Sequence, residues 1–87
     1  MLTSSELCGE LHIGPDLLDR WIDIGWLSPA RDGGAATYAD IDVARARLIL
    51  ELSTDFEVNE QGIGIIIDLI DQIHGLRLAL RQVLDTR

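Results

Sequence analysis

GPDLLDRWIDIGWLSPAR, residues 14–31, carries the clearest fold signal in this chain of 87 residues. Gly14 and Pro15 suit the start of a helix, because proline has no amide hydrogen to leave unsatisfied in the first turn. Gly25 suits the left-handed conformation that ends many helices. The apolar residues between these signals recur at helical spacing and are expected to face a core: Leu17, Leu18, Trp21 and Ile22.

A short helix is predicted immediately before this stretch. Thr3 and Glu6 have the spacing of a capping box, in which each side chain accepts a hydrogen bond from the other residue's backbone amide. Leu7, Cys8 and Leu11 give the helix one apolar face, and we expect Cys8 to be a small buried residue. Two short helices joined by a tight turn that contains glycine are typical of a helix-turn-helix.

The residues after the second helix predict a wing and a third helix. Trp26–Arg31 and Ala35–Tyr38 flank Asp32-Gly33-Gly34, which indicates a short β-hairpin with a glycine turn. Asp40 is expected to cap a third helix with apolar positions at Ile41, Ala44, Leu48 and Leu52. The predicted fold class is therefore mainly α, a winged helix-turn-helix with a small β-hairpin wing and a long C-terminal helix.

The C-terminal helix is expected to begin after Asn59 and to continue nearly to the end of the chain. About 26 helical residues span roughly 39 Å, more than one small domain can cover. Gly62, Gly64 and Gly75 each weaken the helix by about 1 kcal/mol relative to alanine, which implies close packing at those points or local fraying near Gly75. We assign residues 1–58 to a winged helix-turn-helix domain and residues 59–87 to a helix for core packing and dimerisation.

An apolar seam with heptad spacing runs along this helix. It begins at Ile66, and we predict that its later members form a homodimer contact: Leu69, Ile73, Leu76, Leu80 and Val83. The alternative is that the seam folds back against the helix-turn-helix core.

The net charge of the chain conflicts with DNA binding, the function that its helix-turn-helix pattern suggests. The sequence has no lysine, 7 arginines and 15 acidic residues, with a formal net charge of -8. Residues 1–44 hold two arginines and eight acids, so this half carries 2 − 8 = −6. Binding to duplex DNA depends mainly on neutralising phosphates with basic side chains. The predicted recognition helix instead places three carboxylates on one face, either as an ordinary solvated surface or as a contact for a basic partner: Asp16, Asp19 and Asp23.

The order of these elements resembles the MerR-type winged helix. Residues 24–31, IGWLSPAR, are similar to that family's "IGLL-P-R" stretch, and Tyr38 with Asp42 resembles its "Y-x-x-x-D" entry to the third helix. Within the superfamily, the acidic surface and the C-terminal helix are more similar to the chaperone modulator CbpM. The Gly-Ile start at Gly62 and the Asp-x-Ile-x-x-Leu pattern from Asp71 to Leu76 carry that resemblance.

The resemblance implies a protein that binds and inhibits the J-domain of a DnaJ-like, CbpA-type co-chaperone. An acidic face is complementary to the basic helical surface that J-domains present to their chaperone partner. We therefore expect partner contacts from the three carboxylates and from the apolar joint before the last helix: Asp16, Asp19, Asp23, Phe56 and Val58.

Two other functions stay open at this stage. A MerR-like DNA-binding transcriptional regulator would need its arginines clustered on one surface, locally outweighing the acids: Arg20, Arg31, Arg45 and Arg47. A purely structural dimerising domain would have the seam as its only functional surface.

The composition also indicates what the chain does not do. The residues form no catalytic triad, phosphate-binding loop or cluster of metal ligands, so we expect no enzyme activity, cofactor or metal. The single cysteine, Cys8, cannot form an internal disulfide, and the N-terminus lacks the basic start and apolar run of a signal peptide. The expected location is the cytoplasm, with no membrane span.

Overall fold

A computed structural model describes residues 1–86. The helices and strands in this range, in chain order, are β1 (Leu2–Thr3), α1 (Ser4–Leu11), α2 (Pro15–Asp23), β2 (Ala30–Asp32), β3 (Ala35–Tyr38), α3 (Asp40–Thr54) and α4 (Glu60–Asp85). The prediction of a mainly α winged helix-turn-helix with a long C-terminal helix is confirmed. The chain divides into two compact units, Met1–Glu57 and Val58–Arg87.

The helix-turn-helix is defined by its local capping signals. The Glu6 amide donates to Thr3 Oγ1 at 3.2 Å, and the Thr3 amide donates to Glu6 Oε1 at 3.0 Å, so the predicted capping box is present. His12 ends α1 in the left-handed conformation, with φ of 56°. Pro15 begins α2, and Gly25 follows it with φ of +86°, which favours glycine. The sequence therefore specifies both short helices and the turn between them.

The wing is a three-stranded sheet with strand order β1-β3-β2, one strand more than the predicted hairpin. β2 and β3 are antiparallel, with Arg31 opposite Ala36, and the turn between them contains Gly33 and Gly34 at positive φ. β1 pairs with the other edge of β3 and places Thr3 opposite Thr37. Sequence patterning missed β1 because a two-residue strand has no periodicity of its own.

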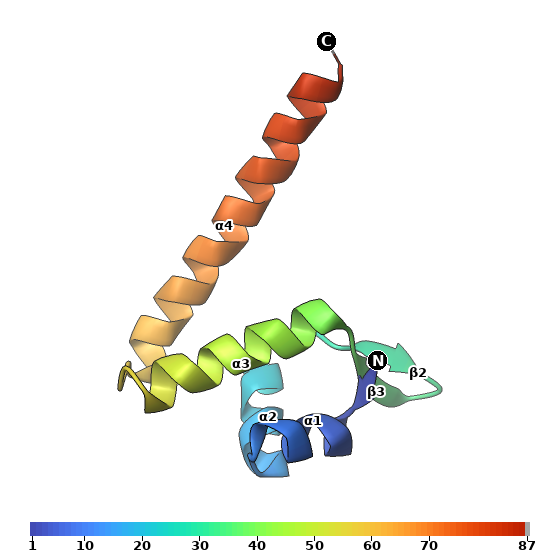
Figure 1. Ribbon diagram of the computed structural model, residues 1–87, viewed down its shortest axis with the longest axis vertical. Coiled ribbons are helices and arrows are strands. Elements are labelled where there is room, and N and C mark those ends of the chain that lie inside the picture. The colour runs from blue at the N-terminus through green and yellow to red at the C-terminus, as the bar shows by residue number, and fades with distance from the viewer. Residues whose placement is uncertain (87) are drawn as a thin grey trace. The chain divides into compact units, whose positions relative to one another are not determined.

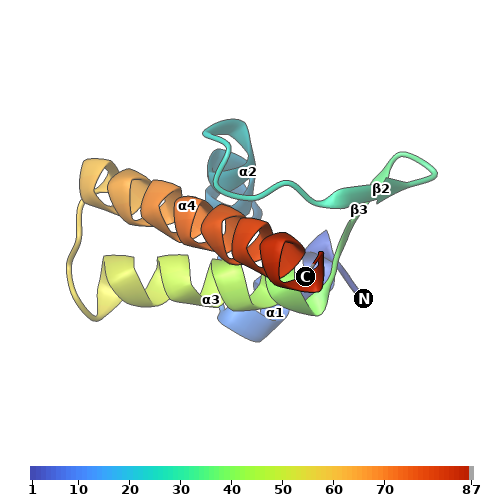
Figure 2. The same cartoon turned by 90° about the horizontal axis from the view of Figure 1, so that it is seen from above.

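The core of the first unit lies where α1 contacts α2, α3 and β3. Figures 1 and 2 show the wing at the start of α3, at the opposite end of that helix from residues 55–57. The buried apolar side chains of this unit come from every helix and from the segment around the wing: Leu7, Leu11, Leu18, Trp21, Trp26, Leu27, Tyr38, Ala46 and Ile49.

The predicted inward faces of α2 and α3 need correction. Leu17 was expected to be inward but is 40% exposed, because α2 buries the narrower stripe of Leu18 and Trp21. In α3, Ile41 is 67% exposed, and the buried residues are Ala46 and Ile49. The cap of α3 is also shifted by one residue: Ala39 is the N-cap, and the Asp42 carboxylate accepts its amide hydrogen at 3.0 Å.

The second unit consists of α4 and the residues that cap it. The Gly62 amide donates to Asn59 Oδ1 at 2.8 Å, as the sequence predicts. Ile63 and Ile67 are buried, whereas every described residue from Asp71 to Thr86 is exposed. The second half of α4, from Asp71 onwards, therefore presents its side chains to solvent.

Gly62 and Gly75 of α4 differ in their surroundings, so replacement by alanine is expected to change the free energy of unfolding differently at the two positions. Gly75→Ala is expected to raise the free energy of unfolding by about 1 kcal/mol, because the new methyl group meets no atom within 4 Å and alanine favours the helix. Gly62→Ala is the matched variant: its methyl carbon would lie 2.6 Å from Val58 Cγ1 and 3.3 Å from Asn59 Oδ1. We expect no such gain from Gly62→Ala, because Val58 and the cap must move. Urea unfolding followed by circular dichroism measures both, and equal stabilisation by the two variants would contradict close packing at Gly62.

The capping box predicts a pH dependence of stability. The hydrogen bond from the Thr3 backbone amide, and then the one with the Thr3 side chain, lower the pKa of the Glu6 carboxyl below its ordinary 4.5. Because the folded state favours the ionised form, this stabilisation is present above about pH 4.5 and is lost as pH falls through the lowered pKa. Glu6→Gln should therefore reduce stability at neutral pH, and the difference from wild type should shrink in acid. A difference that does not change with pH, measured by thermal unfolding, would argue against this assignment.

Candidate protein-binding site

The outer face of α2 is acidic. Asp16, Asp19 and Asp23 are all exposed, while Leu18 and Trp21 on the opposite side are buried. Asp16 lies in the first turn, where the helix dipole favours a negative charge. These spacings of three and four residues keep the carboxylates on one side of the helix. Arg20 is exposed on the same side, so this face carries three carboxylates and one guanidinium and its charge is 1 − 3 = −2.

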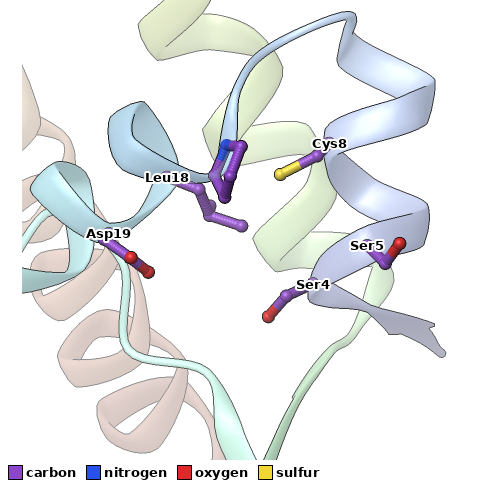
Figure 3. Close-up of a pocket in the computed structure, with 6 residues that line it drawn as sticks. Ser4, Ser5, Cys8, Leu18 and Asp19 are labelled. Carbon is purple, nitrogen blue, oxygen red and sulfur yellow. The ribbon is translucent and has the colours of Figure 1, made fainter.

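A pocket opens between the start of α1 and the start of α2 (Figure 3). Its volume is about 250 Å³, and its walls are mainly apolar. In Figure 3, the Cys8 thiol points towards Leu18, the Ser4 side chain extends from the start of α1 towards α2, and Asp19 comes from α2. The residues that line it are Ser4, Ser5, Cys8, Pro15, Leu18 and Asp19.

One wall of this pocket is fixed by the core. Ser4 Oγ and the Tyr38 hydroxyl lie 3.1 Å apart in a hydrogen bond, and Tyr38 is fully buried. The hydroxyl of Ser4 is therefore held at the start of α1 by a side chain of the wing. Asp19 is the one carboxylate in the pocket lining, so the predicted acidic face and the pocket share this residue.

The pocket was not predicted from the sequence, which indicated that Cys8 is a small buried residue. Cys8 is instead partly exposed, and its thiol contributes to the pocket lining. The available signal was the spacing of Ser4 and Cys8 on α1, and of Pro15 and Asp19 on α2, each four residues apart and hence on one helix face. Only the packing of α1 against α2 shows that these two helix faces line the same pocket.

The two residues of the predicted apolar joint do not line this pocket. Phe56 is 71% exposed, Val58 is partly buried, and neither lines the pocket between α1 and α2. Glu57, between them, adopts the left-handed conformation with φ of 53°. Phe56 is thus an exposed aromatic side chain, and the structure does not group it with the carboxylates of α2 into one pocket.

The predicted dimer seam is exposed along α4. Leu69 and Ile73 are 51% and 47% exposed, and Leu76, Leu80 and Val83 are 60% exposed or more. A contiguous row of exposed apolar side chains is unusual on a monomer and is typical of an interaction surface.

The arginines that a DNA-binding surface would need differ in their surroundings, and Arg20 on α2 lies beside the three carboxylates. Arg45 is partly buried and donates from Nε to the Trp26 carbonyl oxygen, which gives it a structural role. Arg31 on β2 and Arg47 on α3 are exposed. Within residues 1–86, no group of three or more histidine, cysteine or acidic residues is arranged to hold a metal ion. No helix in the same range is both long enough and apolar enough to cross a bilayer.

A winged helix-turn-helix followed by one long helix is the architecture of MerR-type regulators, and comparison with protein families agrees. The family model described as "MerR HTH family regulatory protein" matches residues 2–84. The chain belongs to this family, which is one of regulatory proteins rather than enzymes. A comparison with curated proteins finds no match.

Proposed function

We propose that this chain is a protein-binding modulator that binds and inhibits the J-domain of a DnaJ-like, CbpA-type co-chaperone. The observation that carries the proposal is the exposed acidic face of α2, formed by Asp16, Asp19 and Asp23. This helix is the recognition element of the helix-turn-helix, yet its outward charge opposes contact with phosphates. Chaperone modulators of the CbpM kind belong to the same MerR family.

Electrostatics supports a basic protein as the partner. The chain has no lysine and a net charge of -8, so its field attracts cationic surfaces and repels nucleic acid. Complementary charge accelerates association and disfavours wrong partners more than it adds affinity. The carboxylates of α2 would therefore orient the J-domain, and apolar burial would supply most of the binding energy.

Phe56 and Val58 are the proposed source of part of that burial. An aromatic residue that is 71% exposed has a large apolar area to lose on binding. Aromatic anchors are enriched among the residues that dominate interface energies. Contact through Phe56 would depend little on salt, in contrast to contact through the carboxylates.

We further propose that the chain is a homodimer joined through the seam of Leu69, Ile73, Leu76, Leu80 and Val83. Burying a leucine or isoleucine side chain completely is worth about 1.5–3 kcal/mol, so five such positions in each helix can support a stable pair. The second half of α4 is exposed in the single chain, and a second copy has the same apolar seam to bury.

The second candidate is a DNA-binding regulator. It is favoured by the family description and by Arg31, which is exposed on the wing. It is opposed by the acids on α2 and by the structural hydrogen bond of Arg45. Binding of duplex DNA at physiological salt distinguishes this candidate from the first.

Removing the charge of α2 is expected to weaken J-domain binding. The triple variant Asp16→Asn, Asp19→Asn, Asp23→Asn should lose well over about tenfold in affinity at low salt, because complementary charges are removed. Binding of the wild type should also weaken as NaCl is raised, since salt screens exposed charges. The matched control changes net charge equally on exposed residues elsewhere: Glu51→Gln, Asp68→Asn and Asp85→Asn.

Titration calorimetry with the purified J-domain measures these affinities, and fluorescence polarisation with duplex DNA is run in parallel. Equal losses in the two triple variants would remove the acidic face from the interface. No J-domain binding at low salt, together with tight DNA binding at physiological salt, would replace the first candidate by the second.

Replacing a leucine on the seam and a leucine off the seam is expected to have different effects on dimerisation. Leu76 lies on the seam, whereas Leu78 lies on the opposite side of α4, and both are exposed in the single chain. Leu76→Ala should weaken the dimer by about 2 kcal/mol or more, because each helix loses a buried side chain. Leu78→Ala should leave the dimer intact. Sedimentation equilibrium measures the association constants, and a wild-type chain that stays monomeric at high concentration would rule out the dimer.

A further inference from the structure

We propose that the pocket between α1 and α2 receives one long basic side chain, arginine or lysine, from the bound partner. The inference rests on the proposed function, because it identifies where the acidic face makes a specific contact. The pocket is lined by Ser4, Ser5, Cys8, Pro15, Leu18 and Asp19 and lies entirely within the first unit.

The size of the pocket fits a single side chain. Its volume of about 250 Å³ is below the roughly 300–1,000 Å³ of sites that enclose whole small-molecule ligands. It is nevertheless much larger than the ~30 Å³ that one water molecule occupies in the liquid. A flexible side chain entering from solvent fits this space.

The chemistry of the walls favours an occupant that is apolar along its length and cationic at its end. Cys8 and Pro15 offer apolar surface beside the buried Leu18, and Figure 3 shows the thiol pointing towards Leu18. Lysine and arginine pack their methylene stems on such surface while their charged ends reach a polar group. Asp19 provides that group, because a carboxylate can accept charge-assisted hydrogen bonds from an ammonium or a guanidinium.

The one charged side chain in the pocket lining, Asp19, favours a cation over an anion. A phosphate or a carboxylate placed here would face Asp19 in a half of the chain that carries two arginines against eight acids. Ser4 is already held by its hydrogen bond with Tyr38, so its hydroxyl can accept a hydrogen bond from an incoming cation without first being ordered. Asp16 and Asp23 lie on the same helix but outside the pocket lining, which makes them suitable controls.

The first test uses a probe that does not require the J-domain. Titration of the full chain with n-butylguanidinium, followed by amide NMR, is expected to shift the signals of Ser4, Cys8 and Leu18. Asp19→Asn should abolish these shifts, and Asp23→Asn should preserve them. The uncharged analogue n-butanol, titrated in the same way, should give much smaller shifts. Equal shifts with both compounds would contradict recognition of the cation.

The second test uses Cys8 as a reporter, because it is the only cysteine in the sequence. Bound J-domain is expected to slow the reaction of the Cys8 thiol with N-ethylmaleimide. Conversely, chain already modified at Cys8 should bind the J-domain at least about tenfold more weakly, because the adduct fills the pocket. The Cys8→Ser variant, treated with the same reagent, controls for effects elsewhere.

The third test compares single carboxylates in J-domain binding. Asp19→Asn should cost about tenfold or more in affinity, as expected for a charge pair enclosed by an interface. Asp23→Asn should cost about fivefold at most, as expected for an exposed pair.

The tests separate the two proposals. If the J-domain binds but Cys8 stays fully reactive and Asp19→Asn behaves like Asp23→Asn, the pocket inference is wrong and the proposed function stands. If the probe binds the pocket but the J-domain does not bind the chain, the proposed function is wrong and the site belongs to another basic partner.

Discussion

The burial of Tyr38 is the constraint that orders the first unit. Tyr38 is fully buried at the end of β3, pairs with Leu2 of β1 across the sheet, and hydrogen-bonds through its hydroxyl to Ser4. A buried phenol needs both apolar contact and a partner for its hydroxyl, and this position provides both. The wing and α1 are joined at this residue, and the orientation of α1 then sets how α2 packs against it.

This arrangement explains how a helix-turn-helix with the shape of a DNA-binding domain can present an acidic surface. Packing requires only the inner stripe of α2, Leu18 and Trp21, so the outer residues can be carboxylates without loss of core packing. The pocket beside Asp19 is lined by small side chains of α1, Ser4 and Cys8, which leave space between α1 and α2. The residues of α1 and α2 that stabilise the fold therefore differ from those that would contact a partner.

Most helix boundaries could be predicted because they depend on interactions within a few residues. The capping box of Thr3 and Glu6, the proline that begins α2, the glycine after it and the Asn59 cap all form as their spacing indicates. The heptad seam of α4 is equally local, and its exposure agrees with a surface that is not needed by the single chain. Hydrogen bonds and steric limits between near neighbours are encoded directly in residue order.

Features that depend on distant residues were established only by the tertiary structure. β1 exists because Leu2 and Thr3 reach Tyr38 and Thr37, and two residues alone carry no strand pattern. Periodicity marked Leu17 and Ile41 as apolar positions of helices, but the rotation of each helix against its neighbours left both exposed. Cys8 lines a pocket rather than the core for the same reason. Residue order thus specified which helices form and where they end, while packing between segments far apart in the chain selected their buried faces and created the pocket.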